Sequence, residues 1–180
     1  DWVFGFAELA PEMRERIAAA RLVSNPGCYS TGAIAIVAPL VAAGLIDETE
    51  ALSINAVSGY TGGGKAMVAD FEAGTAPVHF IYGLDQRHKH IPEIMTHGGL
   101  LLQPVFAPSV GNFAQGMAVQ LPLQLDDDRS VAALHQALAD HYANEAFVQV
   151  VPADQIGARI DPTALKARGR CICRICLETL

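Results

Sequence analysis

The feature that most constrains the fold of this chain is a long window without charged residues, from Asn25 to Ile46. Its first eight residues are polar or small, and the apolar part begins only at Ala33 and contains Pro39. A helix that spans a bilayer needs about 20 apolar residues in succession. The window therefore predicts a mostly buried helix from Tyr29 to about Ala43, bent or ended near Pro39, and not a membrane span.

The composition agrees with a soluble globular domain. The 180 residues are 51% hydrophobic and 17% charged, which excludes a disordered tail or a fibrous repeat. The net charge of −7 gives no general electrostatic surface for nucleic acid or for an anionic membrane. The N-terminus has neither an initiating Met nor a signal-peptide pattern, and four cysteines are too few for a disulfide scaffold. We expect a cytoplasmic domain whose chain begins inside a longer gene.

Helical and extended patterns alternate unevenly along the chain. Besides the central helix, helices are predicted at about 7–21, 65–71, 91–97 and, after the acidic run at 126–128, up to about 143. Strands are predicted at 51–57, 78–82, 100–107, 117–125 and 147–151. Several of these strands are joined by loops too short for a crossover helix. The pattern therefore favours an α+β fold with a mainly antiparallel or mixed sheet.

Cys28 is the strongest candidate for a reactive side chain. It follows the turn Asn25-Pro26-Gly27 and precedes the predicted central helix. The free N–H groups and the positive dipole end at a helix N-terminus stabilise a thiolate, and they can also hold the oxyanion formed when a thiolate attacks a carbonyl. The alternative is a small buried cysteine that only fills space.

A second candidate cluster is His88-Lys89-His90-Ile91-Pro92-Glu93. A cysteine nucleophile needs an acid or base beside it, and histidine serves near neutral pH. One histidine would move the proton, while Glu93 would orient it or bind substrate. A metal site built on His-x-His has no evident third ligand, and a solvated polar loop is the other alternative.

The segment from Gly59 to Lys65 matches the start of a phosphate-binding P-loop, G-x-x-x-x-G-K. Ala66 stands where that motif has the Mg²⁺-binding Ser or Thr, so a nucleoside triphosphatase is not favoured. A glycine-rich loop that allows close backbone approach to a substrate or to Cys28 fits more simply. Lys65 would then meet a phosphate or a carboxylate.

The last residues differ from the rest of the chain. The segment from Arg168 to Cys176 has three arginines and three cysteines. A C-x-C-x-x-C run can ligate zinc or an iron–sulfur cluster, but a closed site needs a fourth ligand. An exposed or poorly ordered tail is the favoured interpretation, and no metal is expected.

Three motifs, in their order and spacing, resemble those of the N-acetyl-γ-glutamyl-phosphate reductases of arginine biosynthesis. They are the segments 25–29, 58–65 and 88–93, and residues 4–9 resemble the stretch before the catalytic cysteine of that family. The resemblance covers about residues 1–162. It implies an α+β domain with helices on one face of the sheet, like the catalytic domain of glyceraldehyde-3-phosphate dehydrogenase, which carries the cysteine and forms homo-oligomers. Residues 1–165 would be this catalytic and dimerisation domain and 166–180 an atypical tail, with the N-terminal NADP-binding Rossmann domain absent.

The resemblance also implies a reaction and its residues. Cys28 would attack the acyl phosphate of N-acetylglutamyl 5-phosphate, and NADPH would reduce the resulting thioester to N-acetylglutamate 5-semialdehyde. His88 or His90 would supply the proton, with a slight preference for His88. The implied substrate contacts are Ser58, Tyr82, Glu93 and, more weakly, Lys65; the implied cofactor contacts are Gly59, Gly62 and Gly63. A sister reductase acting on aspartyl or carrier-linked aminoadipyl phosphate is one alternative, and a non-catalytic oligomerisation fragment is another.

Overall fold

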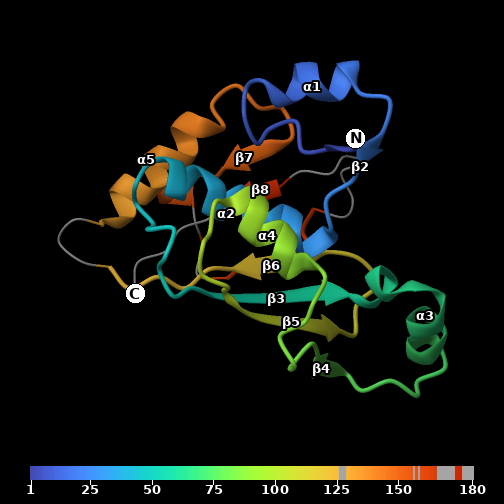
Figure 1. The fold of residues 1–180 in the computed structure, drawn as a ribbon. Helices are drawn as coiled ribbons and strands as arrows, with labels where there is room; N and C mark the ends of the chain where they lie inside the picture. Colours follow the sequence, from blue (N-terminus) through green and yellow to red (C-terminus); the bar gives the residue numbers. More distant parts are fainter. Residues whose placement is uncertain (126–128, 156, 158, 166–172, 176–180) are drawn as a thin grey trace.

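The computed structural model describes residues 1–125, 129–155, 157 and 159–165 and the backbone of 173–175 (Figure 1). Its helices are α1 (Met13–Ala19), α2 (Cys28–Ala42), α3 (Gly64–Glu72), α4 (His90–Gly98) and α5 (Val131–His141), with short 3₁₀ turns η1 (Tyr60–Gly63) and η2 (Ala153–Gln155). Its strands are β1 (Val3–Phe4), β2 (Val23–Ser24), β3 (Ser53–Gly59), β4 (His79–Ile81), β5 (Val105–Gly111), β6 (Met117–Gln120), β7 (Val148–Val150) and β8 (Cys173–Ile175).

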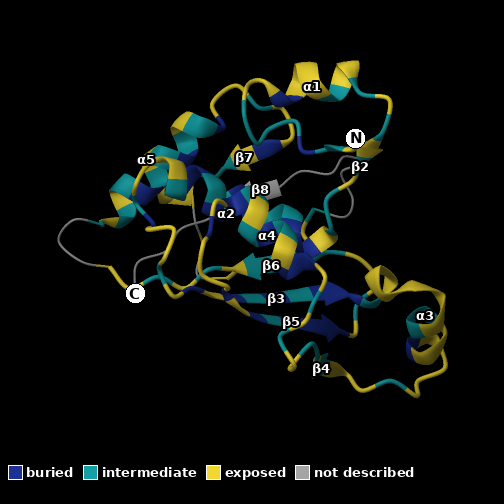
Figure 2. Ribbon diagram, viewed as in Figure 1, coloured by how far each residue is buried: buried dark blue, intermediate teal, exposed yellow. Residues whose placement is uncertain are grey.

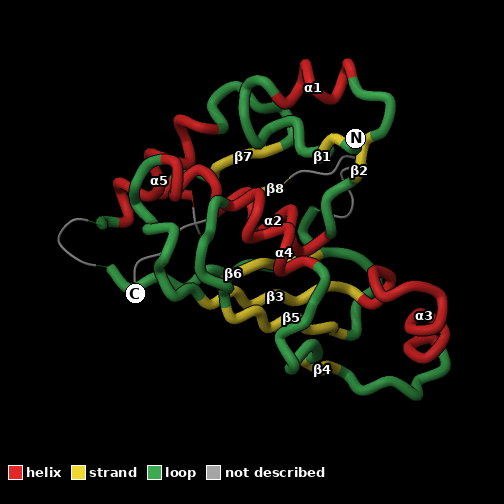
Figure 3. Tube along the Cα trace, viewed as in Figure 1, coloured by secondary structure: helices red, strands yellow, loops and turns green. Residues whose placement is uncertain are grey.

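The main sheet has four strands in the order β4-β5-β3-β6. Its central strands β3 and β5 run parallel, from Ser53↔Val105 to Gly59↔Gly111, while β4 and β6 pair antiparallel at the two edges. The sheet is therefore mixed, as the sequence predicted. The parallel pair needs a long crossover, and residues 60–104 provide it with α3, β4 and α4 (Figure 3). Short parallel pairs β1–β2 and β7–β8 lie outside this sheet.

Helix α2 forms the centre of the hydrophobic core, which confirms the prediction of a buried helix (Figure 2). The helix does not end at Pro39 but continues to Ala42. Proline has no N–H to donate to the carbonyl four residues earlier, here that of Ala35. The Tyr142 hydroxyl, at the end of α5, donates to that carbonyl at 2.8 Å and so satisfies it. Within the described residues, no helix has both the length and the apolar character to cross a membrane.

The two faces of the sheet differ in what covers them. Ile54 and Phe106, opposite each other on β3 and β5, are fully buried in the core with α2 and α4. Because side chains alternate along a strand, the residues at the intervening positions of the sheet face away from the helices. Among them Ile81 and Val105 are 54% and 57% exposed. Figure 1 shows both helices on one side of the sheet, so the described part of the chain leaves the other side open.

The tail contributes one described element, strand β8, which pairs with β7 in the register Val148↔Cys173. Cys171 and Cys176, the other cysteines of the suggested metal motif, lie outside the described residues, so the structure does not test that motif. No cluster of three or more His, Cys, Asp or Glu side chains able to hold a metal occurs in the described part of the chain.

Candidate active site

Cys28 is the first residue of α2, and its side chain is exposed and not in a disulfide. The carbonyl of Gly27 accepts bonds from the Thr31 N–H and from the hydroxyls of Ser30 and Thr31, each at 2.9 Å. These bonds fix the turn before the cysteine and begin the helix there. The first-turn N–H groups lack partners inside the helix and carry its positive dipole end at the thiol. Exposure excludes the alternative of a buried, space-filling cysteine.

Glu93, on the first turn of α4, holds the same turn from the other side. Its Oε2 accepts the Gly27 N–H at 3.0 Å and a bond from the Ser30 hydroxyl. The carboxylate suggested as a substrate contact thus binds the backbone next to Cys28. It therefore joins the start of α4 to the start of α2.

His90 is buried, with 4% of its surface exposed, and it packs directly on the cysteine turn. A Cβ placed on Gly27 would lie 2.2 Å from His90 Nε2, so only glycine allows this contact. Burial, and next the neighbouring His88, lowers the pKa of His90 to about 4, although Glu93 acts in the opposite direction. His90 is therefore neutral at neutral pH. Its Nδ1 has no hydrogen-bond partner among the described residues.

His88 lies two residues before His90, in the loop that leads into α4, and it is half-buried. Its Nδ1 accepts the backbone N–H of His90 at 3.2 Å, which satisfies one free donor at the start of α4. A nitrogen that accepts a hydrogen bond carries no proton, so the neutral ring has its proton on Nε2. Burial, and next the charge of Lys89, lowers the pKa of His88. The ring centre lies 4.6 Å from that of His90.

Tyr29 connects the cysteine helix to the sheet. Its hydroxyl donates to the Ser109 carbonyl at 2.8 Å and lies 2.7 Å from Ser58 Oγ, so Ser58 donates to Tyr29. Ser58 is thus buried in a bond to the protein itself. The pKa values of Tyr29 and Tyr82 are raised, above all by burial and in part by the negative charge that a Cys28 thiolate would carry. Tyr29 therefore joins the start of α2 to the central strands β3 and β5.

The glycine-rich segment lies at the C-terminal end of β3 and continues through η1 into α3. A Cβ on Gly59 would lie 2.5 Å from the Ala114 carbonyl oxygen, and one on Gly63 would lie 2.2 Å from Met67 Sδ. Close approach of two backbone segments therefore explains Gly59, whereas the Met67 side chain near Gly63 can move. Around Gly62, by contrast, a Cβ would meet only Ser58 Oγ at 3.9 Å. Lys65 is exposed on α3 and, with Thr61 and Glu72, lines a hollow of about 350 Å³.

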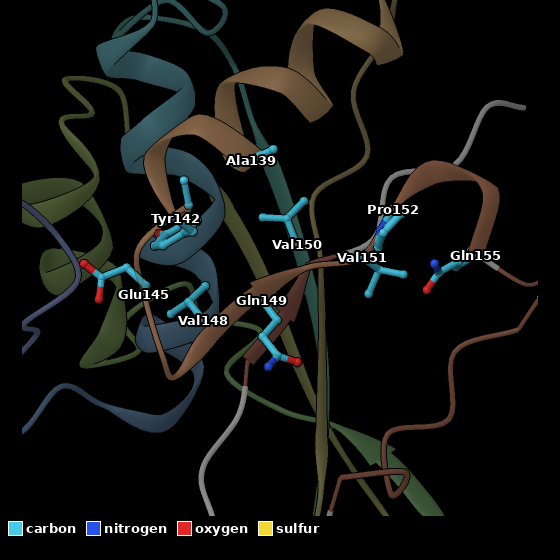
Figure 4. Close-up of a pocket in the computed structure, with 10 residues that line it drawn as sticks. Ala139, Tyr142, Glu145, Val148, Gln149, Val150, Val151, Pro152 and Gln155 are labelled. Carbon is cyan, nitrogen blue, oxygen red and sulfur yellow. The ribbon is translucent and has the colours of Figure 1, made fainter.

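A pocket of about 470 Å³ lies elsewhere, between α5 and β7 (Figure 4). Its lining residues are Ala139, Tyr142, Ala143, Glu145, Val148, Gln149, Val150, Val151, Pro152 and Gln155. None of them belongs to the three sequence motifs. The structure thus brings His88, His90, Glu93, Ser58 and Tyr82 around the start of α2, and it leaves Lys65 on an exposed helix.

Two contributors to this arrangement were not predicted from the sequence. Tyr29 directly follows Cys28, and its place on the buried face of α2 is the only signal that could have marked it. Ser109 acts through its carbonyl, for which a sequence carries no signal.

Comparison with known proteins agrees with this geometry. Residues 28–179 match the family described as "Semialdehyde dehydrogenase, dimerisation domain". The chain is 52% identical over 178 residues to a protein of Brucella anthropi and 52% identical over 175 residues to one of Rhizobium meliloti, both named "N-acetyl-gamma-glutamyl-phosphate reductase". These matches cover 93% and 92% of the chain but only 57% and 56% of the relatives, so the chain spans little more than half their length.

The fold also has a solved counterpart. A probable aspartate-semialdehyde dehydrogenase from Pseudomonas aeruginosa superposes with a TM-score of 0.60 at 14% identity, over 90% of this chain and 54% of that one. This likeness confirms the predicted fold class. The family match covers two of the three predicted motifs in full and also Cys28. The chain therefore belongs to the semialdehyde dehydrogenase dimerisation-domain family, with N-acetyl-γ-glutamyl-phosphate reductases among its relatives.

Proposed function

We propose that this chain is the catalytic and dimerisation part of an enzyme that reduces N-acetylglutamyl 5-phosphate to N-acetylglutamate 5-semialdehyde. The observation that carries the proposal is an exposed cysteine at the start of α2, directly after Gly27, whose N–H binds Glu93 and against which His90 packs. The names of relatives at 52% identity support this substrate over an aspartyl or carrier-linked phosphate.

In the proposed first step the Cys28 sulfur attacks the acyl carbon. A C–S bond forms, the bond to the phosphate oxygen breaks, and inorganic phosphate leaves with the electron pair of that bond. The N–H groups of the first turn of α2, which have no partner inside the helix, would donate to the carbonyl oxygen and stabilise its negative charge. A thioester on Cys28 remains.

His88 is the better candidate for the acid that protonates the substrate oxygen during reduction. The bond from the His90 N–H to His88 Nδ1 leaves the His88 proton on Nε2, which makes no hydrogen bond to any described residue. Burial lowers the pKa of both histidines, so charge does not distinguish them, but the Nε2 of His90 is packed against Gly27. We therefore propose that His90 positions the cysteine turn while His88 transfers the proton.

NADPH would supply the hydride that reduces the thioester carbonyl and would leave as NADP⁺. Because close approach to the Ala114 backbone explains Gly59, we propose that the cofactor is held mainly by a Rossmann domain outside these 180 residues, with Gly62 as the loop position that has free space. Among the substrate contacts, Tyr82 faces the His88 ring with ring centres 5.6 Å apart. Lys65 would contribute only through its charge.

The open face of the sheet is the proposed homo-oligomer interface. The matched family is described as a dimerisation domain, and this face exposes Ile81 and Val105 on neighbouring strands. Aspartate at either position should shift the protein toward monomer in sedimentation experiments. The matched control, Trp2→Asp, changes an apolar residue that is 66% exposed and lies next to the N-terminus, which Figure 1 shows on the helix side of the sheet. It should leave the assembly unchanged.

The acyl-transfer step can be tested without a cofactor. Protein mixed with N-acetylglutamyl 5-phosphate should release one phosphate per active site and gain the mass of the acyl group on a peptide containing Cys28. Cys28→Ser should lower turnover at least about a thousandfold in the whole enzyme and abolish the acyl adduct. A triple Cys→Ser variant at 171, 173 and 176 is the control and should behave as the wild type. Absence of the adduct on Cys28 would favour a non-catalytic fragment, and faster reaction with aspartyl phosphate would favour the sister enzyme.

A further inference from the structure

The segment that carries the two histidines leaves the sheet abruptly after β4. Antiparallel pairing of β4 with β5 ends at Ile81↔Ser109, and the Tyr82 N–H extends it by one bond to the Pro108 carbonyl at 3.0 Å. Gly83 then turns the chain away with a φ of +65°. By the register of the pair, residue 84 would come opposite Phe106, but Leu84 is 77% exposed and the chain there is a loop (Figure 3).

The side chain of Gln86 takes the place of that missing strand residue. Its Oε1 accepts the Phe106 N–H at 2.8 Å, and its Nε2 donates to the Phe106 carbonyl at 2.9 Å. One amide group thus satisfies both backbone groups that an antiparallel partner would have satisfied. We call this pair of bonds the Gln86 clip.

The backbone of Gln86 is held as firmly as its side chain. Its φ of +56° is the left-handed value that only glycines share among the described residues. Such a conformation persists where surrounding contacts enforce it. Here the Gln86 N–H donates to the Gly83 carbonyl at 3.0 Å, and Gln103 Nε2 donates to the Gln86 carbonyl at 3.3 Å.

The clip acts on the same structure that carries the histidines. His88 lies two residues beyond Gln86, and its ring centre is 5.2 Å from that of Phe106, the residue that the clip binds. Phe106 also packs edge-on against Tyr29, 5.8 Å away. We propose that Gln86 is a positioning residue that fixes His88 against Phe106 and beside the cysteine turn; its catalytic importance rests on the function proposed above.

The clip can be tested by nuclear magnetic resonance on the 180-residue chain. Gln86→Asn shortens the amide by one methylene, while asparagine still tolerates a left-handed backbone, so the variant removes the clip without adding strain. Amide hydrogen exchange at Phe106 should accelerate about tenfold. At pH 8 the ring ¹⁵N shifts of His88 should change from a single Nε2–H form to a mixture of tautomers. Gln136→Asn, on α5, is the matched control and should change neither signal.

A second variant keeps the test informative if Gln86→Asn does not fold. Gln86→Glu keeps an acceptor for the Phe106 N–H but, when ionised, has no donor for the carbonyl. It should preserve slow exchange at the Phe106 amide while it still loosens the His88 ring. Wild-type exchange and wild-type His88 shifts in folded Gln86→Asn would overturn the proposal. In the whole enzyme Gln86→Asn should lower kcat with little change in KM. A broken clip with unchanged kcat would instead contradict the acid role proposed for His88.

Discussion

The histidine segment and the glycine-rich loop have similar prominence in the sequence, but the structure treats them differently. Within residues 83–93, Gln86 and Glu93 bond to Phe106 and Gly27, and His88 accepts the backbone N–H of His90. The glycine-rich loop is bound to residues 113–116 by the N–H groups of residues 59–61, whereas Gly62 has only one distant neighbour and Lys65 is exposed. Side-chain bonds therefore fix the first region along its length. The second region is fixed at its start and leaves Gly62 and Lys65 accessible to a ligand.

The largest difference between the regions should appear in the dependence of stability on pH. The folded protein holds the pKa of His90 near 4, while an unfolded chain titrates histidine near 6.5. Between these values the unfolded state binds more protons, so stability is full above about pH 6.5 and falls as the pH falls toward 4. The loss attributable to His90 is about 3 kcal/mol. Urea unfolding measured from pH 4 to 7.5 checks it.

His90→Asn provides the control for this titration. The variant should be less stable at pH 7.5 but should show a shallower decline toward pH 4. Some decline will persist, because burial also lowers the pKa values of His88 and His97. A decline as steep as that of the wild type would show that His90 does not carry the effect.

Two alanine substitutions compare the regions directly. Gly27→Ala forces a Cβ against His90 Nε2 and to within 2.8 Å of Glu93 Oε2, so it should cost about 2 kcal/mol and displace the cysteine turn. Gly62→Ala meets open space and should leave the free energy of unfolding unchanged. Thermal and urea unfolding of both variants give the comparison. If folded Gly62→Ala loses affinity for NADP, the loss would indicate that the cofactor binds next to Gly62, because the fold does not need that glycine.

The bonds of Tyr29 should have a smaller effect. Tyr29→Phe leaves the Ser109 carbonyl without its donor and Ser58 without its acceptor, and we expect a loss of about 1.5 kcal/mol. Ser58→Ala should cost less, because the Tyr29 hydroxyl keeps its bond to Ser109. A double-mutant cycle measured by urea unfolding separates the two bonds. Equal losses in both single variants would contradict the donor assignment.

The sequence predicted the parts of this arrangement that depend on local chemistry. The Asn-Pro-Gly turn followed by Ser and Thr placed the start of α2 within one residue of Cys28. Helix formers and start signals located the other helices, and the extended patterns located β3 to β7 but not β1, β2 or β8. It could not predict that α2 continues through Pro39, because the Tyr142 hydroxyl that permits this is more than 100 residues away. The parallel pairing of β3 and β5 likewise depends on a crossover of which the sequence shows only the pieces.

In the candidate site, too, the sequence predicted what local chemistry decides and missed what distant contacts decide. Cysteine, histidine and glycine motifs are visible in the sequence because their residue types are chemically distinctive. The bonds from Glu93 to Gly27 and from Gln86 to Phe106 join residues 66 and 20 positions apart, through side chains that are common at protein surfaces. The sequence motif marked Glu93 but not its bond to Gly27, and no local pattern marked Gln86. The positioning contacts of the site therefore had to come from the structure.

The smallest predicted effect compares one lysine from each region. Lys89 stands at the start of α4 and lowers the pKa values of both His88 and His90, so Lys89→Met should raise them slightly and also remove a positive charge from the positive end of the helix. Lys65→Met should leave the pKa values of His88, His90 and His97 unchanged, because Lys65 is not among the groups that shift them. In the whole enzyme Lys65→Met should instead raise the KM for the acyl phosphate by about twofold to fivefold, because one exposed charge contact with the substrate is lost. Histidine titrations by nuclear magnetic resonance, together with steady-state kinetics, separate the two variants. A shift in the pKa of His88 caused by Lys65→Met but not by Lys89→Met would contradict this comparison. It would show that the exposed lysine of the glycine-rich loop, and not the lysine of the histidine segment, acts on the histidines.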